Sequence, residues 1–163
     1  MEGGPTLPAS YRTDQLASWT EAPDTAAQAF AGTARYALDF TAPAEIAEAW
    51  LLDLGDVRES AHVRLNGRDL GTLIALPFRI PLGDTLKPGR NRLEVEVTNL
   101  SANRIRDMDL RKVDWKIMKD VNIVNVHYQA LDASQWPIEP SGLLGPVRLI
   151  PLKGFDPAES GNP

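Results

Sequence analysis

The stretch that most constrains the fold is residues 50–71, where apolar and polar side chains alternate before and up to a tight turn. Residues 50–54 and 63–65 place an apolar side chain at every second position. Asn66 and Gly67 follow, and this pair tolerates the positive φ angles of a two-residue hairpin turn. The polar partners are Asp53, His62, Arg64 and Asn66. Because alternate positions face opposite sides of a strand, we expect each strand to turn one face to a core and the other to water.

Other segments alternate in the same way and are predicted to be strands. Residues 34–40 and 92–98 alternate most clearly, and residues 146–152 supply the last strand. Residues 76–80 are expected to lie at a sheet edge, or to have Pro77 facing solvent, because Pro77 cannot donate to a ladder. The residues expected to face inward from these strands include Tyr36, Leu38, Phe40, Leu76, Phe78, Ile80, Leu93, Val95 and Val97. Residues 121–128 also have strand composition, but apolar residues of both parities leave their buried face undefined.

The chain of 163 residues is long enough for one domain with a core. We expect a flexible N-terminal segment at 1–15, a β-sandwich domain at 16–153 and a flexible tail at 154–163. Residues 23–30 predict one helical turn, and residues 99–140 a long ordered loop with one or two helical turns. Seven to nine strands with no long helix predict an all-β fold, an antiparallel β-sandwich of the jelly-roll type.

Charge and hydropathy exclude two classes of partner. The net charge of −5 comes with scattered basic residues, whereas nucleic-acid binding needs a concentrated cationic surface. No apolar run approaches the roughly 20 residues of a membrane span, and residues 1–10 do not have the pattern of a signal peptide. With no cysteine, disulfides and thiolate chemistry are excluded, while the compartment stays open. We therefore expect neither nucleic acid nor membrane as a partner.

Several blocks carry a resemblance to a known domain. Residues 52–71, 76–80 and 86–99 resemble the sugar-binding, galactose-binding-like jelly roll of glycoside hydrolase family 2. Residues 98–107 and 141–149 are more similar to the corresponding domain of the family 106 α-L-rhamnosidases. The resemblance implies an accessory module whose partners are carbohydrate and a catalytic barrel, in a periplasmic or secreted parent enzyme. A chain of this length does not also contain such a barrel.

The loop after the strand at 92–98 holds the candidate ligand-binding residues. Sugar recognition uses amides, carboxylates and arginine for vicinal hydroxyls, with an aromatic ring against the apolar side of the sugar. The residues with this chemistry are Asn99, Asn103, Arg104, Asp107, Trp115 and Trp136. The resemblance implies that Asn99 or Asn103 reaches the active site of a neighbouring barrel. The alternative is that the two asparagines cap turns, Arg104 pairs with Asp107, and both tryptophans pack under the loop.

Catalytic and metal sites find less support in the sequence. The acidic residues of the loop are Asp107, Asp109, Asp114 and Asp120, and we interpret them as solvated surface charge rather than as a glycosidase pair. His62 and His127 are the two histidines, too few for a zinc site without distant carboxylates. We predict no cofactor, with a structural Ca²⁺ as the alternative. The predicted function is non-catalytic carbohydrate binding; a structural buttress for a barrel and a small standalone glycosidase are the alternatives.

Overall fold

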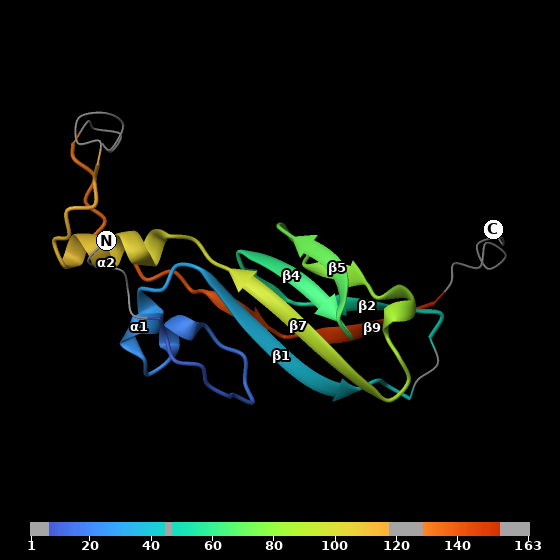
Figure 1. Cartoon of the computed structure of the whole chain (residues 1–163). Helices are drawn as coiled ribbons and strands as arrows, with labels where there is room; N and C mark the ends of the chain where they lie inside the picture. Colours follow the sequence, from blue (N-terminus) through green and yellow to red (C-terminus); the bar gives the residue numbers. More distant parts are fainter. Residues whose placement is uncertain (1–6, 45–46, 118–128, 154–163) are drawn as a thin grey trace, which may run out of the picture.

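The computed structural model describes residues 7–44, 47–117 and 129–153, which form an all-β sandwich of antiparallel strands (Figure 1). One layer is a four-stranded sheet in the order β1-β7-β4-β5. Its strands are β1 (Thr33–Thr41), β7 (Arg90–Thr98), β4 (Ser60–Leu65) and β5 (Arg68–Leu73). The other layer contains a three-stranded sheet, β6-β2-β9, and the pair β3-β8. These strands are β2 (Ala49–Asp53), β3 (Asp56–Arg58), β6 (Arg79–Pro81), β8 (Gly142–Gly145) and β9 (Arg148–Leu152). The predicted fold class is confirmed.

The core lies between the layers and follows the alternation in the sequence. Along β4 and β7 every second side chain is buried, while the intervening positions are open to solvent. The buried hydrophobic residues of these strands are Ala61, Val63, Leu65, Leu93, Val95 and Val97. The opposite layer contributes Leu52, Leu54, Val57, Phe78, Ile80, Leu82 and Leu143. Each fully buried valine or leucine contributes about 1.5–3 kcal/mol relative to an exposed one, so this alternation is the main source of stability.

The turn between β4 and β5 is the predicted hairpin, with φ of 54° at Asn66 and 79° at Gly67. We had expected the side chain of Asn66 to face water, but it is hydrogen-bonded to other parts of the chain instead. Its Nδ2 donates to the Thr85 carbonyl and to Asn91 Oδ1, both at 2.8 Å, and its Oδ1 accepts from the Arg92 amide at 3.0 Å. The turn is therefore tied to the chain that enters β7.

Two residues predicted to face the core are exposed. Leu76 is 79% exposed because β6 begins only at Arg79, so the chain before Phe78 is not part of a sheet. Leu38 is 55% exposed because β1 is an edge strand. The expectation that Pro77 lies beside an edge strand is correct, since β6 is at the edge of its sheet.

The short elements agree less closely with the sequence patterns. The predicted turn near residue 25 is α1 (Thr25–Gln28), capped by Asp24, whose Oδ1 accepts from the Ala26 amide at 2.9 Å. In the predicted loop, α2 (Ala102–Leu110) is one helix of nine residues. Strands β3 and β8 were not expected. The 3₁₀ turns are η1 (Trp19–Glu21) and η2 (Gly83–Thr85).

Some predictions fall wholly or partly outside the described residues. The expected strand at 121–128, with His127, lies there, as do Asp120 and the tail at 154–163. Of the expected flexible segment at 1–15, residues 7–15 are described and contain no helix or strand. The domain boundaries therefore stay predictions.

Candidate functional site

Helices α1 and α2 lie at the same end of the sandwich, beyond the end of β7 (Figure 1). Positions three and four apart share a face of a helix, and one face of α2 continues through its C-terminal cap at Arg111. The residues on this face are Asn103, Arg106, Asp107, Leu110 and Arg111. Polar and charged groups therefore face α1 together with a single leucine.

An open cleft of about 460 Å³ separates this face from α1, and we call it the α1/α2 cleft. From α1 and its C-terminal cap come Thr25, Ala26, Gln28 and Ala29; from α2 and its cap the five residues named above; and from the later chain Ile138. Leu110 and Ile138 are 48% and 40% exposed. The cleft thus combines aliphatic surface with hydroxyl, amide and guanidinium groups, a composition suited to a polar ligand that has an apolar side.

The charges in the α1/α2 cleft do not all cancel. Arg111 donates three hydrogen bonds to the Asp107 carboxylate, at 3.1, 3.0 and 2.7 Å, and these bonds raise the pKa of the guanidinium. Arg104 also reaches Asp107, at 3.4 Å. Arg106 is different, because its Nε donates to the Trp136 carbonyl at 2.7 Å while its terminal nitrogens have no partner within the described chain. Arg106 therefore keeps two donor groups for a ligand.

Beneath this end of the sandwich, the buried hydroxyl of Ser141 joins three segments, and we call the group Ser18, Asn99, Asn103, Glu139 and Ser141 the Ser141 junction. Ser141 Oγ is 3.1 Å from Asn99 Nδ2 and 3.4 Å from Asn103 Nδ2, and it donates to the Glu139 carbonyl at 3.2 Å. The Ser141 amide donates to Ser18 Oγ at 2.9 Å. The junction fixes the start of α2 against β8 and η1.

The two candidate asparagines are held by the backbone. Asn103 is 3% exposed; its Nδ2 donates to the Glu139 carbonyl and its Oδ1 accepts from the Glu139 amide, both at 2.8 Å. Asn99 donates to the Phe30 carbonyl at 2.9 Å and accepts from the Gly32 amide at 3.0 Å. These contacts match the alternative in which the amides order the loop. A ligand role for either stays a prediction.

On the other side of α2, Asp109 organises a second cleft of about 600 Å³. The Asp109 side chain is 7% exposed, so our interpretation of it as solvated surface charge is wrong. It accepts from the Trp115 indole at 2.7 Å, from the Ala133 amide at 2.8 Å and from Lys116 at 3.2 Å. Burial by itself would raise the pKa of this carboxyl, but the hydrogen bonds together lower it. The cleft is lined by Asp109, Leu110, Lys112, Val113, Asp114, Lys116, Asp132 and Ser134.

Two of the carboxylates in this second cleft, Asp109 and Asp132, do not have the pKa of a general acid. A general acid needs a raised pKa to stay protonated near neutral pH. The amide of Ser134 lowers the pKa of Asp132, as the contacts above lower that of Asp109. Both carboxylates are therefore suited to holding the loop and not to donating a proton.

The two candidate tryptophans lie apart from the α1/α2 cleft. Trp115 is half-buried, bound to Asp109, with Lys116 Nζ 5.3 Å from the centre of its ring. Trp136 is 38% exposed, and its backbone carbonyl accepts a hydrogen bond from Arg106 of α2. Of the six candidate residues, only Asn103 and Asp107 line the cleft.

Sequence reasoning missed Arg106, Asp109 and Ser141. The three-and-four spacing from residue 103 to residue 111 would have placed Arg106 on one helical face. No signal in the sequence distinguishes the serine at 141 or the buried aspartate at 109 from their neighbours.

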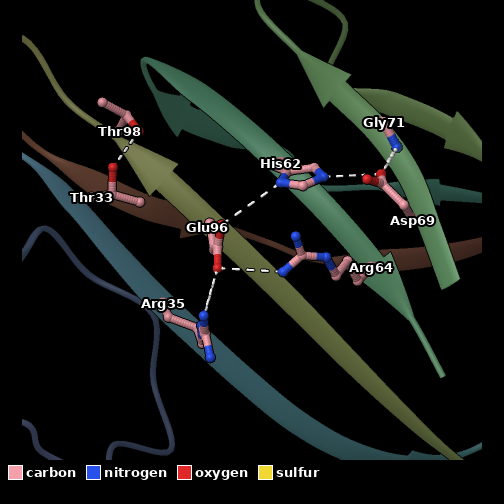
Figure 2. A network of polar contacts seen from close by, with 8 residues as sticks. All are labelled: Thr33, Arg35, His62, Arg64, Asp69, Gly71, Glu96 and Thr98. Carbon is pink, nitrogen blue, oxygen red and sulfur yellow. Dashed lines mark hydrogen bonds and ion pairs between the residues drawn. The ribbon is translucent and has the colours of Figure 1, made fainter. Parts of the chain in front are cut away.

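A different polar region covers the outer surface of the four-stranded sheet (Figure 2), and we call Arg35, His62, Arg64, Asp69 and Glu96 the open face. Glu96 accepts from Arg35 at 2.9 Å and lies 3.6 Å from Arg64 and 3.7 Å from His62. His62 Nε2 is 2.9 Å from the Asp69 carboxylate. These pairs link all four strands, and their charges largely compensate one another.

Metal sites and membrane-spanning helices find no support in the described residues. Across 7–44, 47–117 and 129–153, no group of three or more histidines, aspartates or glutamates is arranged to hold a metal ion. Each helix in those ranges is too short or too polar to span a bilayer. The Ca²⁺ alternative thus gains no support from these residues.

Comparisons with known proteins place this chain beside glycoside hydrolases. No protein-family model matches it. A putative beta-glucuronidase of Formosa agariphila is 34% identical over 158 residues, which cover 85% of this chain and 14% of that protein. The solved structure of a rhamnosidase from Novosphingobium sp. PP1Y matches 87% of this chain with a TM-score of 0.68 and 31% identity. A beta-glucuronidase of Bifidobacterium dentium, complexed with coumarin-3-O-glucuronide, matches 56% of this chain with a TM-score of 0.50 and 27% identity.

The coverage of these relatives is as informative as the identity. The chain spans 14% of the curated relative, 13% of the rhamnosidase and 16% of the Bifidobacterium enzyme. It is therefore similar to a small part of much longer glycoside hydrolases, consistent with a partial, accessory domain.

Proposed function

We propose that this chain is a non-catalytic, carbohydrate-binding accessory domain of a glycoside hydrolase, and that its sugar site is the α1/α2 cleft. The observation that carries the proposal is the lining of this cleft, where free hydroxyl, amide and guanidinium groups surround exposed aliphatic side chains. A cleft of about 460 Å³ has the size of a small-molecule site, which is roughly 300–1,000 Å³.

The proposed mode of binding follows from which groups are free. Thr25 and Gln28 on α1 are exposed and can exchange hydrogen bonds with vicinal hydroxyls, while Leu110 and Ile138 offer an apolar surface to ring C–H groups. The asparagines of the Ser141 junction fix the start of α2, and so position the cleft-facing side chains of that helix. This modifies the hypothesis from the sequence, in which loop amides, arginine and tryptophan contacted the sugar.

The experiment is a titration of the purified chain with rhamnose, galactose and glucuronate, followed by amide chemical shifts. We expect shifts confined to α1 and α2, and about three- to tenfold weaker binding in Gln28→Ala, which removes one amide. Gln15→Ala, at an exposed glutamine outside the cleft, is the matched control. No shift at millimolar ligand, or equal loss in both variants, would contradict the proposal.

One observation favours the second function, in which the domain buttresses a catalytic barrel. Ile74 and Leu76, in the connection between β5 and β6, are each 79% exposed. Adjacent exposed aliphatic side chains indicate a docking surface or a liability for association. Sedimentation velocity should then show self-association that Leu76→Lys abolishes. Leu7→Lys, at a leucine that is 77% exposed, is the control, and a chain that stays monomeric throughout speaks against the buttress.

A further inference from the structure

Resting on the proposed sugar-binding function, we infer that the α1/α2 cleft selects sugars that carry a carboxylate, and that Arg106 is the group that recognises it. The two arginines that line the cleft differ in their partners, and this difference bears on the class of sugar that the cleft selects.

Arg111 is occupied, whereas Arg106 is oriented and free. The Nε and one terminal nitrogen of Arg111 are bound to the Asp107 carboxylate. In Arg106 only Nε is engaged, and its 2.7 Å bond to the Trp136 carbonyl fixes the plane of the guanidinium. Its terminal nitrogens have no partner in the part of the chain that the structure describes. A fork held in this way loses little side-chain entropy when it binds.

The net charge of the residues that line the cleft also favours an anionic ligand. Asp107 is the single carboxylate among its lining residues, and Arg111 neutralises it. Arg106 therefore leaves the lining with one net positive charge, although the chain as a whole carries −5. The lining of this cleft therefore attracts an anionic ligand, in contrast to the net negative charge of the whole chain.

The geometry of the free group specifies the anion. A guanidinium presents parallel donors that match the two oxygens of a planar carboxylate, and such bidentate pairs are among the strongest hydrogen bonds in proteins. A hexuronate carries this carboxylate on a ring whose hydroxyls would lie near Thr25 and Gln28. The aliphatic pair Leu110 and Ile138 suits the apolar side of the same ring.

The test compares two probes of equal shape, methyl β-D-glucuronide and methyl β-D-glucoside, titrated into the full chain. We expect the glucuronide to bind about tenfold more tightly, with the difference shrinking as salt is added. Arg106→Gln should lower the affinity for the glucuronide to about that for the glucoside and so abolish the preference, and Arg106→Lys should keep part of the preference. Arg35→Gln, at an exposed arginine of the open face, should have no effect.

Each other outcome is decisive. Equal affinity for the two methyl glycosides overturns the inference and leaves the proposed function standing, whereas no binding of any sugar overturns both. Glucose 6-sulfate binding as tightly as the glucuronide would show that charge alone is recognised, and would also overturn it. If Arg106→Gln proves unstable because it loses the Trp136 contact, the probe ratio in the unmodified chain still decides, together with shifts mapped to the cleft.

Discussion

The open face and the Ser141 junction are both polar networks that link several elements, but they are built differently. The open face joins four strands through ion pairs between side chains that are 25–62% exposed. The Ser141 junction uses uncharged side chains that bond mainly to backbone groups, with Asn103 and Ser141 only 3% and 2% exposed.

The comparison shows that the number of polar contacts is a poor guide to their importance. Water can replace an exposed ion pair at little cost, so such pairs contribute about 0–1 kcal/mol as a class. A buried amide that satisfies backbone groups has no such substitute, because removing it leaves those groups unpaired. We therefore expect the Ser141 junction to hold the α1/α2 cleft, and the open face chiefly to keep the sheet soluble.

The largest effect is expected for Asn103→Leu. The substitution keeps the size of the side chain but removes the partner of the Glu139 amide and leaves the Glu139 carbonyl with Ser141 Oγ alone, at a cost of about 1–3 kcal/mol in the free energy of unfolding. Urea unfolding measures it. Thr33→Val, which removes the exposed hydroxyl bond between Thr33 and Thr98 on the outer sheet surface, is the matched control (Figure 2). Equal destabilisation by both variants would refute the contrast between the two regions.

An intermediate effect is expected for Asp109→Asn, with a loss of about 1–2 kcal/mol at pH 7. Because the hydrogen bonds place the folded-state pKa of Asp109 below its unfolded value of about 3.9, the carboxylate stabilises the fold above that pH. This stability is lost as the pH falls through the folded-state pKa. Stability measured against pH should therefore decline less steeply below about pH 4 in the variant than in the parent. Parallel curves would exclude Asp109 as an acid-sensitive contact.

The smallest effect is expected for Glu96→Gln, although this residue contacts three other charged or ionisable side chains. The hydrogen bond from Arg35 is the main cause that lowers the pKa of Glu96. Since the pairs are exposed, the change in urea midpoint should be slight and should vanish in about 1 M salt, where screening acts over about 3 Å. A large shift that survives salt would mean that the open face stabilises the sheet after all.

The sequence predicted the sandwich because its signal is repeated along the chain. In β4 and β7 the alternation of apolar residues, the Asn66-Gly67 turn and the buried positions all agree. It failed where a strand is short or lies at an edge. Strands β3 and β8 have only three and four residues, too few to show an alternation. Leu38 shows that a residue with the spacing of the inward face stays exposed where no second layer covers it.

The sequence predicted where the candidate site lies, but not which groups its side chains bind. The loop after β7 does lie at the rim of the sandwich. One or two helical turns were predicted there, but the position and length of α2 were not, because its apolar residues do not form a stripe and its cleft-facing side is charged. An asparagine that binds sugar and one that binds Glu139 look the same in a sequence. Which it is depends on residues 36 positions away, which only the fold brings together.

The separation along the chain of the groups in the Ser141 junction also sets an order of events during synthesis. The Ser141 amide donates to Ser18 Oγ, 123 residues earlier in the chain, whereas the sheet β1-β7-β4-β5 is complete by Thr98. We expect this sheet to pair on the ribosome while the end that carries α1 waits for the last quarter of the polypeptide, because contacts distant in sequence form late. A chain truncated after β7 would then retain strand structure without a sugar site. Sugar binding would therefore indicate that the segment with Ser141 has been synthesised and has folded.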